Sequence, residues 1–152
     1  MLDWLCAHAD IFENFKVKIR AHPNVPMEKV VEQCLSEIPG HFNIAQEPLK
    51  DDLAKSFCVA YRQSSIGIQA LSNGIPVIHL KVDLPLPGDP IEELTSGKWV
   101  ANDAQQLKSA IYAITQLSES RKTELINQAR GFLKDYFARP TPETMKVFLA
   151  NN

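Results

Sequence analysis

The segment from Phe57 to Leu80 constrains the fold more than any other part of the chain. It begins with the run Phe-Cys-Val-Ala-Tyr and ends with Ile-Pro-Val-Ile-His-Leu. Short apolar runs of this kind are typical of strands that are buried on both faces of a parallel sheet. Ser64 and Ser65 favour a helix start between the two runs, and Gly74 and Pro76 favour its end. The segment therefore predicts a strand–helix–strand unit with a right-handed crossover.

The start of this helix is the place where the sequence points to chemistry. The first N–H groups of a helix have no partner inside it and lie at the positive end of the helix dipole, so they attract anions. Ser64 and Ser65 add hydroxyl groups there, and Arg62 adds a cation just before them. A plain helix cap explains the two serines equally well. We therefore expect either a cap or a phosphate-binding site at this point.

The alternation of strand-like and helix-like patterns predicts a single α/β domain over residues 1–152. The expected architecture is a three-layer, doubly wound sheet of the Rossmann or flavodoxin-like class, with about five parallel strands in the order 2-1-3-4-5. Extra helices follow from about residue 118. Helices are also expected at 2–14, 27–38, 48–54 and 91–94, and strands at 17–20, 42–45, 57–61, 75–80 and 98–101.

In that strand order the first and third strands are neighbours, and ligands bind beyond their carboxyl ends. Arg20 and His22 follow the first strand, so we expect them to meet Arg62, Ser64 and Ser65 in one crevice. The alternatives are an ion pair for Arg20 and an ordinary turn histidine before a proline for His22.

Composition excludes several classes of function. The net charge of −2 gives no basic surface for nucleic acid, and no apolar run reaches the length of a membrane span. Cys6, Cys34 and Cys58 are far apart and lie within apolar patterns, which indicates reduced, buried thiols in a cytoplasmic protein. The histidines show no metal-binding spacing, and Asp89 lies in a proline-rich turn between residues 81 and 90, where a turn-forming role is expected.

Two stretches resemble one family of enzymes. Ser64 to Val77 reads Ser-Ser-Ile-Gly-Ile-Gln-Ala-Leu-Ser-Asn-Gly-Ile-Pro-Val. It is similar to the pattern Ser-Ser-x-x-x-Glu-Ala-x-x-x-Gly-x-Pro-Val in the C-terminal half of GT-B glycosyltransferases. Val17 to Pro23 resembles the strand and His-Pro segment of the same families. The nearest in pattern are bacterial capsule and surface-polysaccharide enzymes and the related UDP-N-acetylglucosamine 2-epimerases.

The resemblance implies a nucleotide diphosphate sugar as ligand, UDP- or CDP-linked, with no other cofactor. It implies that Ser64, Ser65 and the helix N–H groups hold the diphosphate. Because Arg62 is close to these serines in the chain, we expect it to contact the phosphates too. Gly67 either allows close approach of that ligand or packs the helix on the sheet. Gln69 stands where the family pattern has a glutamate that grips the ribose hydroxyls. A glutamine accepts a hydrogen bond there without a charge, which weakens the contact.

The resemblance also implies a separate N-terminal domain, with the acceptor site and the catalytic base, that this chain lacks. We therefore expect binding without turnover and assign no catalytic residue. The helix that carries Met145, Phe148 and Leu149 is expected to pack on that domain or on a second copy. Two alternatives stay open: a non-catalytic flavodoxin-like module for protein interaction, and a relative of the 2-epimerases.

Overall fold

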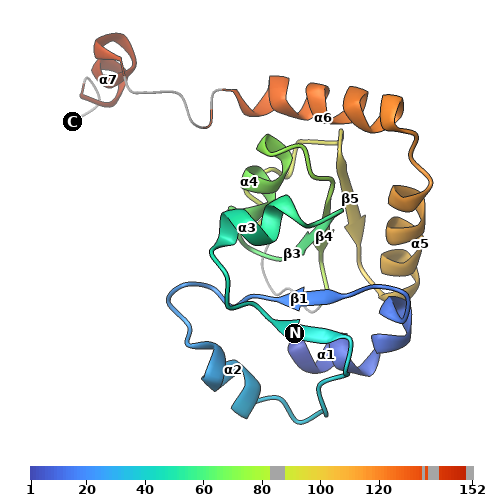
Figure 1. The fold of residues 1–152 in the computed structure, drawn as a ribbon. Coiled ribbons are helices and arrows are strands. Elements are labelled where there is room, and N and C mark those ends of the chain that lie inside the picture. Colours follow the sequence, from blue (N-terminus) through green and yellow to red (C-terminus); the bar gives the residue numbers. More distant parts are fainter. Residues whose placement is uncertain (83–87, 135, 137–140, 150–152) are drawn as a thin grey trace.

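The computed structural model describes residues 1–82, 88–134, 136 and 141–149. It is an α/β structure in which all the strand pairs are parallel, arranged in two small sheets (Figure 1). One sheet has the order β1-β2 and the other the order β3-β4-β5. The strands are β1 (Val17–Ile19), β2 (Phe42–Ile44), β3 (Val59–Tyr61), β4 (Val77–Leu80) and β5 (Lys98–Ala101).

The predicted positions of the strands are confirmed, but the prediction of one five-stranded sheet is wrong. Among the described residues β1 pairs with β2, and no pairing joins β1 to β3. In Figure 1 the strands of the two-stranded sheet run across the direction of β4 and β5. The physical reason lies in charges within and just after β1, because Lys18 and Arg20 form ion pairs with Asp52. These contacts hold β1 against the helix that precedes β3 rather than beside β3 itself.

The helices are shorter than predicted in the N-terminal part. The expected helix at 2–14 divides into an α-helix and a 3-10 helix, and the expected helix at 27–38 ends at Glu32. Asp3 explains that early end, since its carboxylate accepts from the N–H groups of Leu35 (2.7 Å) and Ser36 (3.0 Å). Residues 91–94 form a turn instead of a helix. The elements are α1 (Leu2–Ala7), η1 (Ala9–Phe12), α2 (Met27–Glu32), α3 (Leu49–Ala54), α4 (Ile66–Ser72), α5 (Ala104–Thr115), α6 (Glu119–Leu133) and α7 (Pro142–Leu149).

The central strand–helix–strand unit forms as its sequence predicts, with β3, α4 and β4 in succession. Gly74 ends α4 with φ at 86°, a value that favours glycine. Its N–H donates to Leu71 O at 2.9 Å, and the N–H of Ile75 donates to Ala70 O at 3.0 Å. These two bonds form the Schellman motif, which satisfies carbonyl groups at the end of a helix.

Two apolar clusters cover the two faces of the β3-β4-β5 sheet. Tyr61 and Val77 face a cluster built with α4 and α6, whereas Ile78 and Leu80 face one built with α5 and η1. β4 is buried along its whole length because it lies between β3 and β5 and under both clusters. Within the part of the chain that the structure describes, no helix is both long and apolar enough to cross a membrane.

Candidate functional site

The two serines at the start of α4 have different environments. Ser64 Oγ accepts a hydrogen bond from the N–H of Ile66 at 3.3 Å, so Ser64 caps the first turn. Ser65 is the residue before the helix, is exposed, and makes no capping hydrogen bond through its side chain. The Ser65 hydroxyl therefore lies at the solvent-facing start of α4, beyond the carboxyl end of β3.

Arg62 joins the ends of two neighbouring strands. It follows β3 directly, and its Nη2 donates to the carbonyl oxygen of Val82, two residues beyond β4, at 2.9 Å. A guanidinium group has five N–H donors in one plane, a geometry that suits the oxygen atoms of a phosphate. Arg62 is half-buried and lies next to the serines in the chain.

Gly67 is needed for packing. A Cβ atom on Gly67 would lie 2.7 Å from Cζ of the Tyr61 ring, far inside van der Waals contact. The glycine therefore lets α4 approach β3 closely. Of the two roles predicted for Gly67, this is the packing of the helix on the sheet. Gln69 is half-buried and follows Ser65 by four residues, so the two side chains share one face of α4.

The structure does not bring Arg20 and His22 to this place. Arg20 forms an ion pair with Asp52 and donates to the carbonyl of Glu47, so the alternative of an ion pair is correct for it. His22 is exposed in a turn, where its Nδ1 accepts from the N–H of Asn24 at 3.2 Å. The expected crevice shared by the two motifs depended on pairing of β1 with β3, which does not occur.

A buried cluster of ionisable groups was not predicted from the sequence. The side chains of Asp89 and Lys98 are only 2% and 4% exposed, and Asp89 Oδ2 lies 2.8 Å from Lys98 Nζ. Tyr61 Oη donates to Asp89 Oδ1 at 2.8 Å. The ring of His79, 1% exposed, stacks on Tyr61, with its Nδ1 3.2 Å from Asp89 Oδ2. That contact lacks hydrogen-bond geometry, so neither ring nitrogen of His79 has a hydrogen-bond partner among the described residues.

The pKa values of the cluster follow from burial and these contacts. Burial would raise the pKa of Asp89, but hydrogen bonds from Lys98, Tyr61 and the N–H of Ile91 outweigh it and lower that pKa. Burial lowers the pKa of His79, and the nearby Asp89 opposes this shift only in part. Burial, and then the bond to Asp89, raise the pKa of Tyr61. The cluster therefore holds an ionised aspartate, a neutral histidine and a neutral tyrosine at neutral pH.

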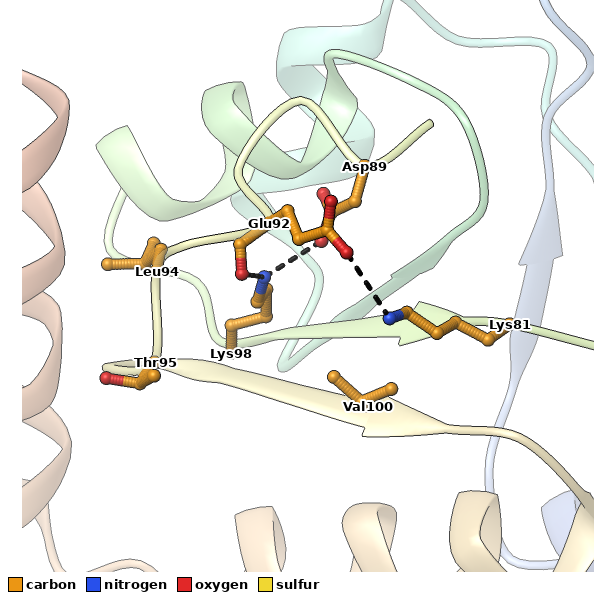
Figure 2. A pocket seen from close by; sticks show the side chains of 7 residues that line it. All are labelled: Lys81, Asp89, Glu92, Leu94, Thr95, Lys98 and Val100. Carbon is orange, nitrogen blue, oxygen red and sulfur yellow. Dashed lines mark hydrogen bonds and ion pairs between the residues drawn. The ribbon is translucent and has the colours of Figure 1, made fainter. Parts of the chain in front are cut away.

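A pocket of about 200 Å³ opens beside this cluster (Figure 2). In Figure 2 the side chains of Lys98 and Lys81 point toward Asp89 and Glu92, respectively, and the Lys81–Glu92 ion pair spans 3.8 Å. Each cation at the pocket thus has a carboxylate beside it, and none of the residues expected at the α4 site lines it. The lining residues are Lys81, Asp89, Glu92, Leu94, Thr95, Lys98 and Val100.

Lys98 holds the turn at residues 91–94 onto the sheet. Its Nζ donates to the carbonyl groups of Ile91 and of Glu92, the latter at 3.0 Å, in addition to Asp89. Three acceptors satisfy the three protons of an ammonium group, so Lys98 has no proton left for a ligand.

Within the expected Pro-rich loop, residues 83–87 lie outside the described residues. The sequence signal for the cluster was His79, a polar residue inside an apolar strand, because a buried polar group needs a partner.

In the part of the chain that the structure describes, no three His, Cys, Asp or Glu side chains are grouped so that they could hold a metal ion. Comparisons with protein-family models, with curated proteins and with solved structures found no match.

Proposed function

We propose that this chain is a glycosyltransferase-like domain that binds a nucleotide diphosphate sugar at the start of α4 and belongs to surface-polysaccharide biosynthesis. One observation carries the proposal: Arg62 directly follows β3 and the exposed Ser65 starts α4, so both residues come just after the carboxyl end of a strand in a parallel sheet. Ligands of open α/β sheets bind beyond the carboxyl ends of the strands. The similarity of Ser64–Val77 to the GT-B pattern supports the same site.

In the proposed complex, Arg62 and the Ser65 hydroxyl bind the diphosphate together with the first N–H groups of α4. Both contacts are charge-assisted hydrogen bonds, which are stronger than neutral ones. Gln69, one turn further along the same face, contacts the ribose. The leaving group of a glycosyl transfer is this same diphosphate, so the domain supplies orientation and electrostatic stabilisation. Turnover requires a second domain with the acceptor and the base, so the chain alone binds without catalysis.

Calorimetric titration with UDP, CDP, GDP and their sugar conjugates tests this proposal. We expect a dissociation constant near or below about 1 mM for at least one of them, and a loss of roughly tenfold in Ser65→Ala. Ser72→Ala, at the far end of α4, is the matched control and should bind as the wild type does. No binding across the panel, or an equal loss in both variants, would contradict the proposal.

A second variant tests the position of Gln69. Gln69→Glu restores the carboxylate of the family pattern, so it should strengthen the binding of UDP through a charge-assisted bond to the ribose. It should not strengthen the binding of inorganic pyrophosphate, which has no ribose. If both ligands bind more weakly to Gln69→Glu, the side chain lies near the phosphates and the ribose assignment is wrong.

The exposed apolar surface near α2 favours a second candidate function, that of a protein-interaction module. No residue of α2 is buried, and Leu35, just beyond it, is 96% exposed. Met145 in α7 is exposed as well, while the side chains of Phe148 and Leu149 are outside the described ones. Light scattering over a concentration series tests self-association through either surface. A monomer at all concentrations would remove a second copy as the partner.

A further inference from the structure

His79 is a buried histidine whose surroundings suit the neutral ring but not the charged one. Its side chain is 1% exposed on the central strand β4, and its ring stacks on Tyr61 with 5.2 Å between the ring centroids. Among the described residues, neither ring nitrogen has a hydrogen-bond partner. A protonated ring in this position would carry a positive charge and two N–H donors without a protein acceptor, which is far more costly than burying a neutral ring.

Asp89, the nearest carboxylate, is already shared among other donors. Its Oδ2 lies 3.2 Å from His79 Nδ1, but Lys98 Nζ lies 2.8 Å from the same oxygen. Its Oδ1 accepts from Tyr61 Oη at 2.8 Å and from the N–H of Ile91 at 3.1 Å. Protonation of His79 would therefore place two cations against one carboxylate, among side chains that are 1%, 2% and 4% exposed. A net positive charge buried in this way destabilises the arrangement that encloses it.

The other ionisable groups around His79 do not supply a second counter-charge. Lys81 follows β4 and opposes a charge on His79, whereas Glu92 favours it, and these two form an ion pair with each other at 3.8 Å. Lys98, at the start of β5, opposes it as well. The helices on this face of the sheet, α4 and α6, contribute apolar side chains to its cluster. The balance of charges therefore favours the neutral ring as long as the turn after Asp89 is in place.

That turn is fixed to the sheet by the same groups. Lys98 points from β5 toward Asp89 and Glu92, and its Nζ donates to the Asp89 carboxylate and to the carbonyl of Glu92 (Figure 2). It also donates to the carbonyl of Ile91. A positive charge on His79 repels Lys98 and competes with it for Asp89, so it weakens the contacts that hold the turn in place.

We propose that protonation of His79 releases the turn at residues 89–95 from the sheet, so that mild acid opens the pocket beside it while the rest of the larger sheet stays folded. Release brings His79, Asp89 and Lys98 into contact with water, which removes the cost of the buried charge. The proton comes from the solvent and returns to it when the pH rises, so the change is reversible. The proposal is independent of the nucleotide-binding function.

The direction and the size of the effect follow from linkage. With the turn in place, burial lowers the pKa of His79 below its ordinary value of 6.5, and with the turn released the ring regains that value. The released state therefore binds the proton first as the pH falls, and its population grows. Between pH 7 and pH 5 the growth is at most roughly 25-fold. Asp89 keeps its negative charge over this range, because its pKa is lowered.

Amide hydrogen exchange of the full chain, followed by NMR at pH 7 and pH 5, tests the proposal. The reporters are the N–H groups of Ile91 and Leu94, which are bonded to Asp89 Oδ1 and to Ile91 O within the turn. The references are the N–H groups of Val59 and Val77, which link the strands of the larger sheet. Protection factors correct for the intrinsic effect of pH on exchange. We expect those of Ile91 and Leu94 to fall by up to roughly 25-fold at pH 5.

Low concentrations of urea separate local release from global unfolding. Global unfolding exposes much more surface, so it responds more strongly to urea than a local opening does. At pH 5 the protection factors of Ile91 and Leu94 should be well below those of Val59 and Val77, and they should change little in urea. Equal protection and an equal response to urea at all four positions would overturn the proposal. So would reporters that keep their protection at pH 5.

Two variants assign the effect to His79. His79→Gln and His79→Phe cannot take up the proton, and the second retains a ring that can stack on Tyr61. In both, the protection of the turn should no longer fall between pH 7 and pH 5. His22→Gln, which removes an exposed histidine, is the matched control and should behave as the wild type does. A fall of the same size in a folded His79 variant would overturn the proposal. If neither variant folds, the wild-type comparison of the turn with Val59 and Val77 decides.

Discussion

The two sheets of this protein are held in place by different forces. β4 is buried along its whole length, and apolar clusters cover both faces of the β3-β4-β5 sheet. β1 is partly exposed, and Phe42 is the buried residue of β2. Ion pairs from Lys18 and Arg20 to Asp52 tie this smaller sheet to α3. Ion pairs near solvent contribute little to stability, whereas apolar burial contributes much, so stability should be concentrated in the larger sheet.

The larger sheet also contains charges, but they are of another kind. Asp89 and Lys98 are almost fully buried and share their hydrogen bonds with Tyr61 and the turn after Asp89. The Asp52 side chain is itself only 9% exposed, but those of its partners Lys18 and Arg20 are 38% and 35% exposed. A buried pair that loses one member leaves an uncompensated charge in a medium of low polarity, while water replaces a lost partner at the surface. Loss of the carboxylate is therefore expected to destabilise the protein more at Asp89 than at Asp52.

The largest expected effect distinguishes these two aspartates. Asp89→Asn should lower the free energy of unfolding by about 3–5 kcal/mol, because Lys98 is left buried without its counter-charge. Asp52→Asn should lower it by only about 1 kcal/mol, since Lys18 and Arg20 can turn toward water. Urea unfolding followed by circular dichroism measures both. Equal losses in the two variants would show that the ion pairs of the smaller sheet are as important as the buried cluster.

Apolar truncation compares the two sheets without charges. Ile78 is fully buried in β4, whereas Ile44 in β2 is 39% exposed. Ile78→Ala should cost about 3 kcal/mol from lost burial and the cavity it leaves. Ile44→Ala should cost less than about 1 kcal/mol, because part of the side chain is in water already. The same urea titrations give both values, and a larger loss for Ile44→Ala would reverse the comparison.

A pair of glycines tests packing inside the larger unit. Gly67 lies against the Tyr61 ring, but a Cβ atom on Gly131 in α6 would have nothing within 4 Å. Gly67→Ala should therefore destabilise the protein by about 1–2 kcal/mol, through forced movement of a buried ring. Gly131→Ala should stabilise it by about 0.5–1 kcal/mol, because alanine is the better helix former. The melting temperatures of the two variants should shift in opposite directions. A higher melting temperature for Gly67→Ala would mean that the Tyr61 ring moves aside at little cost.

The same contrast explains which features could be predicted from the sequence. Strand positions were predictable because each strand is a local apolar run, as in Val77–Leu80. The pairing of β1 was not, because it depends on contacts between Lys18 or Arg20 and Asp52, more than thirty residues away in the chain. The two ends of α4 were predictable for the same local reason, the start from Ser64 and Ser65 and the end from Gly74.

The buried cluster shows the limit of local patterns for a site. Asp89 follows a proline-rich stretch, and such a composition indicates a turn, which does not reveal that the carboxylate is buried. Lys98 begins a strand, where a lysine is ordinarily exposed. Their burial results from the turn after Asp89 folding back on the sheet, a tertiary arrangement. His79 was the one residue that pointed to the cluster, but the sequence pattern around it does not show which groups lie against it.

The smallest expected effect is a pH dependence that His79 gives to the larger sheet. The folded state lowers the pKa of His79 below its ordinary value of 6.5, mainly through burial. Above that pH the ring is neutral in both the folded and the unfolded chain, so it adds no pH dependence. As the pH falls below about 6.5, the unfolded chain binds the proton first, and the folded state loses stability. For one proton the slope is at most about 1.4 kcal/mol per pH unit.

The midpoint of urea unfolding should fall between pH 7.5 and 5 in the wild type and in His22→Gln, where the exposed turn histidine is removed. In His79→Gln the midpoint should depend less on pH. An unchanged slope in His79→Gln would show that the acid sensitivity comes from another group.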